Sequence, residues 1–452
     1  MVMGKRQPKQ PELFIPTADL PMSPGHPFYR KLNRVLAEAG FDAFVEKLCL
    51  PYYVQDTGRP SIPPGTYFRM LFIGYFEGLD SQRGIAWRCS DSRSLQEFLG
   101  FLPTEATPDH SSLSNIRGRL PDVVHEQVFA FVLALADKRG LLDGKTVGVD
   151  STLLEANAAM KTLQRRDTGD DYKAYLRKLA AESGLENPTD EELRRFDKKR
   201  KDKKMSNEQW QSPIDPESKI AKMKDGTTHL AYKAEHVVDL KTELVLAAEI
   251  YPADQADSAT LPTSVLTAEL NLARADSAAH IEEVTTDKGY HKVETLADFA
   301  EAEYRTYIPE REQQHDHTWT DKPAEQEQAY RSNRRRVQGK RGKRLQRLRS
   351  ERVERSFAHV CETGGGRRSW LYGVAKISKR YLMQVAAHNL GIVMRRLFGV
   401  GTPRSLQGLE GAFLAFLAVC YSAWQQFTHH SDLQHIVGYH SAAPRRRSLA
   451  AA

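Results

Sequence analysis

Cysteine is scarce in this chain, and no cysteine has a near neighbour of its own kind. The 452 residues contain four, which are Cys49, Cys89, Cys361 and Cys420. None belongs to the Cys-x-x-Cys pairs that are typical of structural zinc sites and redox-active dithiols. The spacing therefore argues against both kinds of site and favours reduced thiols in a cytoplasmic protein.

Long hydrophobic runs are missing as well. The apolar stretch at residues 412–423 is too short to span a bilayer, so we expect core or oligomer contacts there and no membrane partner. Residues up to about 24 are rich in proline and polar groups and lack the basic-then-apolar pattern of a secretory signal. The glycines at 364–366 lack the lysine and the spacing of a P-loop. These absences predict a cytoplasmic protein without a P-loop nucleotide site.

The length and a hydrophobic share of 40% allow two or three domains with real cores. The pattern along the chain predicts a flexible leader at 1–26 and a helical domain at 27–125. An α/β catalytic domain follows at 140–400, and its charged segment 153–228 is a long insertion of the kind that is usually functional or disordered. A helical tail is expected at 401–452.

Helical spacing dominates the N-terminal region, for example at Tyr67, Met70 and Leu71. Asp109 has a side chain suited to capping a helix that carries Arg117. Short helices joined by tight turns are typical of helix-turn-helix DNA binding, but a bundle that serves only packing or dimerisation gives the same pattern.

One acidic residue, Asp150, lies on a predicted strand at residues 145–152. Because side chains alternate along a strand, Val147 and Val149 share one face while Gly148 and Asp150 share the other. The carboxylate is therefore expected to point away from the apolar face.

A second acid, Asp287, closes a strand-like segment that begins at residue 281. Gly289 marks a turn after it, and residues 293–300 then show helical spacing. An acid at the carboxyl end of a strand, just before a helix, is a common site position in open α/β sheets.

A third acid, Glu354, lies on a predicted helix whose apolar face includes Val353 and Phe357. At about 100° per residue it lies roughly 60° from Phe357, at the rim of the buried face. Glu351 falls roughly 160° from Val353 and is expected to face solvent. We therefore prefer Glu354 to Glu351 as a site residue.

The order of the predicted elements connects these acids. Two strand-like runs at 229–238 and 244–251 are joined by a polar turn, which predicts a hairpin. A helix at 258–273 precedes the Asp287 strand. A short strand at 305–308 and the Glu354 helix follow. The order β, β, β, α, β, α, β, α resembles the ribonuclease-H-like fold, a mixed α/β sheet flanked by helices, here preceded by an all-helical domain.

The chain also resembles insertion-sequence transposases of the DDE class, from about Phe28 to about Phe398. The segments that carry this resemblance are Gly58-Arg-Pro-Ser-Ile-Pro-Pro, Pro108-Asp-His-Ser-Ser-Leu-Ser, Gly148-Val-Asp-Ser-Thr, Thr286-Asp-Lys-Gly-Tyr and Val353-Glu-Arg-Ser-Phe-Ala. The resemblance implies that Asp150, Asp287 and Glu354 are the catalytic metal ligands. The implied cofactor is a pair of Mg²⁺ ions, with Mn²⁺ able to substitute, which together promote in-line phosphodiester displacement.

Part of the family's motif around the third acid is not found in this chain. Many related transposases carry a Tyr and an Arg before the glutamate and a Lys seven residues after it. Arg347, Ser350 and Cys361 stand at the corresponding places. The arginine matches only when Glu351 is taken as the acid, and the lysine is missing in either register, so Glu354 and Glu351 both stay open as the third ligand.

Basic residues are concentrated before the third acid. The net charge is +7, and residues 331–349 contain ten Lys and Arg and no acid. Such a run would attract the phosphate backbone of DNA, although a solvated basic linker has the same composition. A second tract at 198–204 is equally compatible with a flexible loop. The predicted DNA-binding residues are Arg334, Arg335, Arg336, Lys340, Arg341, Lys343, Arg344, Arg347 and Arg355.

These observations predict a DNA transposase that binds the ends of its element, cleaves there and joins them to target DNA. The expected partners are double-stranded DNA and further copies of the chain on that DNA, at the nucleoid. Two alternatives share much of the pattern: a ribonuclease-H-like nuclease without strand transfer, and a catalytically silent DNA-binding remnant that acts as a repressor.

Overall fold

The structure is a computed structural model that describes residues 25–54, 61–201, 203, 205–223, 225–311 and 319–406. The chain divides into two units, Met1–Gly401 and Thr402–Ala452, and all elements discussed below except the short helix η6 belong to the first. The predicted leader up to residue 24, the tail beyond residue 406 and its apolar stretch lie outside the described residues.

The N-terminal region is helical, as predicted. Its α-helices are α1 (Pro27–Glu38), α2 (Phe41–Cys49), α3 (Pro64–Glu77), α4 (Gln82–Asp91), α5 (Arg93–Leu99), α6 (His110–Arg119) and α7 (Asp122–Asp137), with the short helix η2 (Leu50–Tyr52) after α2. The capping role of Asp109 is confirmed, because its Oδ1 accepts the Ser112 N–H of α6 at 2.9 Å. Helix α3 is buried from Gly65 to Phe76, since neighbouring helices surround it.

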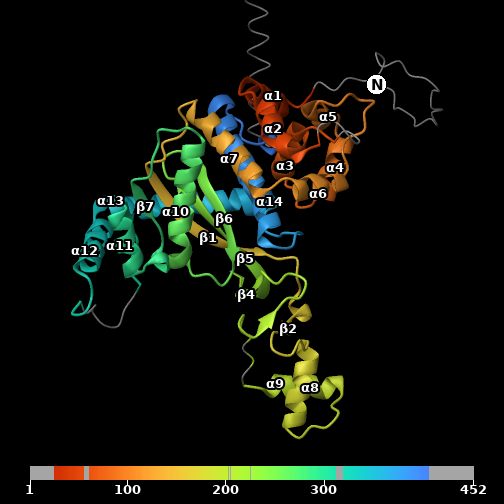
Figure 1. The fold of residues 1–452 in the computed structure, drawn as a ribbon, viewed down its shortest axis with the longest axis vertical. Helices are drawn as coiled ribbons and strands as arrows, with labels where there is room; N and C mark the ends of the chain where they lie inside the picture. The colour runs from red at the N-terminus through yellow and green to blue at the C-terminus, as the bar shows by residue number, and fades with distance from the viewer. Residues whose placement is uncertain are drawn as a thin grey trace, which may run out of the picture. The chain divides into compact units, whose positions relative to one another are not determined.

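A mixed sheet forms the centre of the α/β region (Figure 1). Strand β1 (Thr146–Glu155) pairs antiparallel with β5 (Thr228–Asp239) and parallel with β7 (Glu283–Thr285). Strand β8 (Arg305–Tyr307) extends the parallel side. The other edge of β5 pairs with β6 (Val245–Pro252) and β4 (Lys219–Lys222), so the predicted hairpin is confirmed. This strand order and direction give the ribonuclease-H-like fold that the sequence predicted.

Helices cover both faces of this sheet. Helix α10 (Asp257–Arg274) packs on β5 and β6 from one side, while α13 (Lys340–Phe357) and α14 (Val374–Phe398) pack from the other. Helix α13 lies so close to β1 that a Cβ at Gly148 would be 3.0 Å from Val353 Cγ2. Only glycine fits there, which fixes the position of α13 over the strand.

The remaining elements flank this core. The parallel edge carries η4 (Lys288–Tyr290), α11 (Val293–Glu301) and α12 (Ala324–Gln338), and a π-helical turn, η5 (Ala358–Thr363), follows α13. The insertion after β1 contains η3 (Met160–Thr162), β2 (Gln164–Arg165), α8 (Tyr172–Glu182), α9 (Asp190–Lys199) and β3 (Trp210–Gln211), and after α14 lies η6 (Pro403–Leu406). Leu176 and Leu193 give the insertion a small apolar cluster of its own. None of the described helices is long and apolar enough to cross a membrane.

Candidate active site

Asp150 lies in the middle of β1, on the face that α13 covers. The prediction that its side chain points away from Val147 and Val149 is confirmed, but this second face is covered too. Its cross-strand partner His236 is buried and stacks on Phe357 with 4.1 Å between the ring centroids. Asp150 itself keeps 21% of its side chain exposed, so it lies at the boundary between the core and solvent.

The Asp150 carboxylate forms an ion pair with an arginine. Arg349 Nη1 of α13 donates to Asp150 Oδ2 at 2.7 Å, and the arginine side chain is only 12% exposed. The Arg349 Nε is buried and has no hydrogen-bond partner among the described residues. The ion pair therefore holds α13 against β1 through one end of an incompletely satisfied guanidinium.

Asp287 follows β7, the strand that pairs in parallel with β1. Gly148 of β1 is paired with Thr285 of β7, and each acid comes two residues after its member of the pair. The pairing ends there, so Asp287 lies just past the carboxyl end of β7, while Asp150 lies within β1. Asp287 caps the short helix η4 by accepting the Gly289 N–H at 2.7 Å.

The opposite face of β1 carries a buried ionic network that the sequence reasoning missed. Ser151 donates to Asp257 Oδ1 at 3.1 Å, and Lys233 donates to the same oxygen at 3.1 Å and to Thr260 at 2.9 Å. Lys233 and Glu235 are both buried on β5. The sequence did contain a signal for this network, since Lys233 and Glu235 lie inside a strand-like run of apolar residues. Charged groups are seldom buried without partners, so two of them in such a strand indicate bonding partners elsewhere in the chain.

The buried network is connected to both aspartates. Asp257 accepts a hydrogen bond from Ser151, the residue that follows Asp150 on β1. On the Asp287 side, a Cβ at Gly289 would lie 3.1 Å from Asp257 Oδ2 and 2.9 Å from Asp287 Oδ1, so both carboxylates lie close to this glycine. Tyr290, next to that glycine, donates to Glu235 Oε2 at 2.8 Å. Burial raises the pKa of Glu235, while its hydrogen bonds and Lys233 act in the opposite direction. The backbone around both aspartates is thus fixed from the α10 side.

The third predicted acid is not part of this arrangement. Glu354 and Glu351 are both exposed on α13. Glu354 Oε1 accepts a hydrogen bond from Ser350 at 3.2 Å, while Glu351 pairs with Arg355 at 2.5 Å. On the helical wheel Glu354 is about 140° from Arg349, the residue that meets Asp150. The rotation of α13 about its axis therefore directs an arginine, and not a glutamate, at β1.

The carboxylates fit a divalent cation in part. Asp150 and Asp287 offer the hard oxygen ligands that Mg²⁺ prefers, one on β1 and one after the neighbouring strand β7. Among the described residues, however, no three His, Cys, Asp or Glu side chains gather closely enough to hold a metal ion. The assignment of Asp150, Asp287 and Glu354 as metal ligands therefore stays a prediction, and Glu354 would have to turn toward the two aspartates.

The basic run folds into α12 and α13, and some of its members have partners within the protein. Arg341 forms an ion pair with the buried Glu283, Arg336 donates to the Thr306 carbonyl, and Arg355 bonds Glu243. Arg334 lies 3.4 Å from a carboxylate oxygen of Glu310. These side chains position the helices on the sheet.

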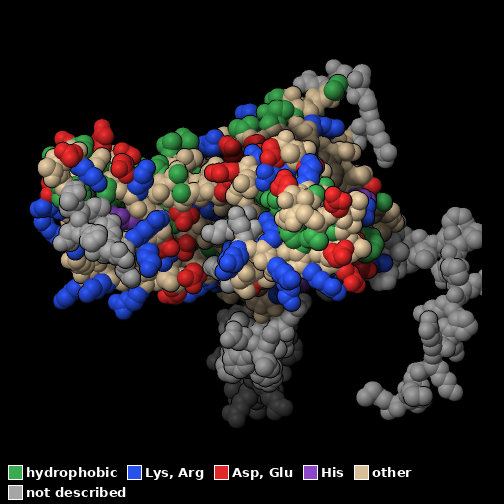
Figure 2. All heavy atoms as spheres, turned by 90° about the horizontal axis from the view of Figure 1, so that it is seen from below, with side chains coloured by type: hydrophobic (Ala, Val, Ile, Leu, Met, Phe, Trp, Pro, Cys, Tyr) green, Lys and Arg blue, Asp and Glu red, His purple; other side chains and the backbone are tan. Residues whose placement is uncertain are grey.

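The other cations of this run face solvent. Arg335, Lys340, Lys343, Arg344 and Arg347 are exposed and have no ion-pair partner in the described part of the chain. We call these five residues the basic face. Figure 2 shows Lys and Arg side chains gathered at the end of the molecule where α12 and α13 lie. Like charges that no acid neutralises form a surface suited to a polyanion.

Comparisons with known proteins agree with this architecture. Residues 18–119 match the family model described as transposase domain (DUF772), and residues 140–390 match the model described as transposase DDE domain. No curated protein and no solved structure matched the chain. Since the second model alone spans more than half of the 452 residues, the chain belongs to the DDE transposase family.

Proposed function

We propose that this transposase binds the terminal repeats of its own insertion sequence, cleaves the DNA at their ends and joins the liberated 3′ ends to target DNA. The observation that carries this proposal is the place of Asp150 on β1 and of Asp287 two residues after β7, the strand that pairs in parallel with β1. That placement, in a chain of this family, supports phosphodiester chemistry on DNA.

In the proposed site Asp150, Asp287 and Glu354 hold two Mg²⁺ ions, and Mn²⁺ can substitute. The bound ions would activate a water or a 3′-hydroxyl and stabilise the leaving oxygen. Arg349 then competes with the metal ion for the Asp150 carboxylate, because the two cations repel each other. Glu354 is followed after three residues by the π-helical turn η5, an irregularity that is frequent at functional sites and favours local adjustment of the helix.

The basic face supplies the proposed binding surface for the DNA backbone. Its five cations lie on the helices that lead to Glu354, so a strand bound there would pass the two aspartates. The helical N-terminal region is proposed to recognise the terminal repeat or to assemble the complex. Two paired ends require more than one copy of the chain, so we propose a homo-oligomer on DNA at the nucleoid.

A catalytically silent DNA-binding protein is the second candidate. The specific observation in its favour is that Arg349 neutralises Asp150 while Glu354 is exposed. Both candidates share the basic face and lose DNA affinity steeply with added salt, so binding alone does not separate them. Metal-dependent cleavage does.

The test is nicking of DNA that carries the element's terminal repeats, with Mg²⁺ or Mn²⁺. Asp150→Asn, Asp287→Asn and Glu354→Gln should each lower the nicking rate at least about a hundredfold, since metal stabilisation of the transition state contributes several kcal/mol. Glu351→Gln is the matched control and should retain activity. If Glu351→Gln abolishes nicking and Glu354→Gln does not, the third metal ligand is Glu351. If the native chain does not nick DNA, the result favours the catalytically silent DNA-binding protein. A strand-joining assay separates the transposase from a simple nuclease.

A further inference from the structure

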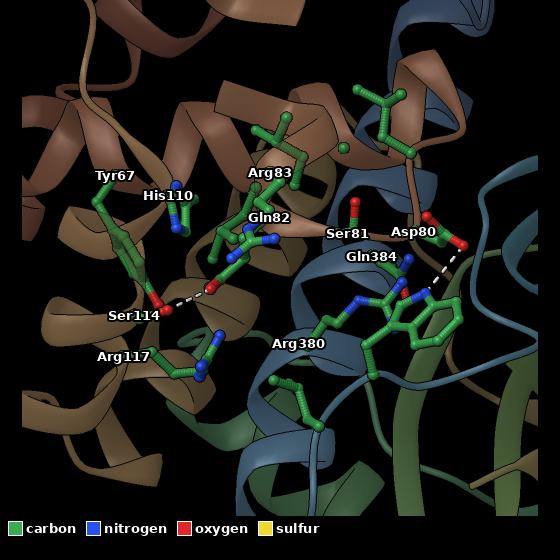
Figure 3. A pocket seen from close by; sticks show the side chains of 16 residues that line it. Tyr67, Asp80, Ser81, Gln82, Arg83, His110, Ser114, Arg117, Arg380 and Gln384 are labelled. Atoms are coloured by element: carbon green, nitrogen blue, oxygen red, sulfur yellow. Dashed lines mark hydrogen bonds between the residues drawn. The ribbon is translucent and has the colours of Figure 1, made fainter. Parts of the chain in front are cut away.

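A pocket of about 270 Å³ lies between the N-terminal helices and the segment that follows α13 (Figure 3). On one side Gln82, Ser114 and Arg117 come from α4 and α6, and on the other Arg380 and Gln384 come from α14. The volume is near the lower limit of about 300 Å³ for small-molecule sites. None of the proposed catalytic groups lines it, so the pocket is separate from the candidate active site.

The pocket has an excess of positive charge. Arg117 is partly buried and has no hydrogen bond or ion pair through its guanidinium among the described residues, and this burial lowers its pKa. Arg380 donates to the carbonyls of Arg368 and Gly365, and burial lowers its pKa to about 10. The only acid on the pocket lining, Asp80, is exposed. An anion beside Arg117 would relieve this imbalance.

The same pocket offers a surface for a flat ring. Trp370 is 43% exposed, and its indole N–H donates to Asp80 at 3.0 Å, which holds the ring in place. The Arg368 guanidinium lies over the ring, 4.4 Å from its centroid, so a base would stack on the other face. Leu71 and Ile85 supply a buried apolar lining. Aromatic side chains of this kind stack on nucleobases irrespective of sequence.

The pocket lies next to the strand that carries Asp150. Ser369 N donates to the Glu155 carbonyl at 3.0 Å, and Asn157 Nδ2 donates to the Trp370 carbonyl at 3.2 Å, so the Trp370 segment runs along the end of β1. At about 3.3 Å per residue, the five residues from Asp150 to Glu155 span roughly 17 Å. DNA at the candidate active site therefore extends to the pocket within a few nucleotides.

We propose that this pocket binds one unstacked nucleotide of a DNA strand, with its phosphate at Arg117 and its base against Trp370. The proposal rests on the proposed function only in that the strand is the one that the transposase processes. An intact duplex is too wide to enter the pocket, and inorganic phosphate alone would leave the apolar lining and the Trp370 ring unused. A nucleotide swung out of the base stack supplies both the anion and the flat ring that these residues suit.

The test compares binding of a fluorescent 12-nucleotide single strand and its 12-base-pair duplex to the full chain by anisotropy. Trp370→Ala should weaken single-strand binding about tenfold or more and duplex binding less than twofold, because stacking on one aromatic residue is worth that much per base. Trp370→Phe should retain most of the single-strand affinity. Arg117→Gln should weaken single-strand binding several-fold. The matched control on the basic face, Arg344→Gln, should weaken both ligands alike.

Unchanged single-strand binding by Trp370→Ala and Arg117→Gln, with melting temperatures like that of the native chain, overturns the pocket. An equal loss for single strand and duplex also overturns it, since a general phosphate contact would then explain the data. The nicking assay keeps the two proposals apart. Nicking combined with binding that is insensitive to Trp370 rejects only the pocket, whereas binding that depends on Trp370 without nicking rejects only the transposase activity.

Discussion

The two faces of strand β1 differ in how completely their charged groups are satisfied. On the α10 face, Lys233, Glu235 and Asp257 form a buried network with Ser151 and Thr260. On the α13 face, Arg349 meets Asp150 with one nitrogen while its Nε stays without a partner among the described residues, and the neighbouring Glu354 is exposed. On the first face Lys233 and Glu235 are buried and bonded, although Asp257 is 33% exposed, whereas on the second face the 12% exposed Arg349 leaves one nitrogen without a partner in the described part of the chain.

This difference suggests a division of labour around the two aspartates. A buried charge network is strongly destabilised when one partner is removed, so it keeps one geometry. A partly exposed ion pair contributes little and exchanges partners readily. The α10 face thus holds the backbone of Asp150 and Asp287 in place, while the α13 face is free to change when metal and DNA bind.

The largest expected effect is on the α10 face. Lys233→Met removes the charge but keeps most of the side-chain volume, so it leaves the buried Glu235 and the partly exposed Asp257 without their cation. We expect the free energy of unfolding to fall by about 3–5 kcal/mol in urea titrations. Lys241→Met is the control, because Lys241 pairs with Asp143 at the surface, and it should leave stability nearly unchanged. Equal effects of the two changes would abolish the contrast between the faces.

Protonation offers a second test, on the α13 face. Burial lowers the pKa of His236 to about 3, so the folded protein keeps this ring neutral while the unfolded chain binds a proton below about pH 6.5. Its stabilising contribution is complete above that pH and is lost as the pH falls toward 3, by about 1.4 kcal/mol per pH unit.

Other buried groups titrate in the same pH range. His125, with a pKa of about 4, acts in the same direction, while Glu249, whose pKa burial raises to about 7, acts in the opposite one. Urea unfolding at pH 7 and pH 5 should therefore show lower stability at pH 5 for the native chain. In His236→Gln the loss of unfolding free energy between pH 7 and pH 5 should be smaller by the contribution of one titrating group, about 1.4 kcal/mol per pH unit below pH 6.5. An identical pH dependence of the two proteins would mean that His236 is protonated in the fold.

Arg349→Met should have a smaller effect on stability. Because Asp150 remains partly exposed to water, we expect a change of about 1 kcal/mol or less in the free energy of unfolding. The Mn²⁺ concentration that gives half-maximal nicking should fall, since no guanidinium competes for the carboxylate. Arg347→Met, at an exposed position of the same helix, is the control for metal affinity. A loss of 3 kcal/mol or more would show that the α13 face is as fixed as the α10 face.

The smallest effect concerns the two glutamates of α13. Glu354→Gln and Glu351→Gln should both leave the melting temperature unchanged, because both side chains are exposed. Any difference between them in nicking then reports on metal binding and not on folding. A marked drop in the melting temperature of either variant would indicate that its carboxylate belongs to a structural contact.

Much of the fold was predictable because it depends on local patterns. Alternation along β1 placed Asp150 opposite Val147 and Val149, and the helical spacing after Gly289 located α11. The insertion at 153–228 was predicted as a charged segment after the Asp150 strand, and it contains the helices α8 and α9. The network around Lys233 was not predicted, because its members are far apart in sequence and meet only when α10 packs on β5.

By itself the sequence predicted the order of strands and helices along the chain, the place of Asp150 on a strand and of Asp287 at the end of one, and the basic character of α12 and α13, since these follow from periodicity and composition along short segments. Only the tertiary structure decided which strands are neighbours and which side chain of α13 faces Asp150. Gly148 lets α13 approach β1 closely, and side-chain packing directs Arg349 toward the strand, a result that one helical wheel does not contain. The pocket at Trp370 was likewise decided there, because its walls come from segments about 250 residues apart that are joined by packing and not by pattern.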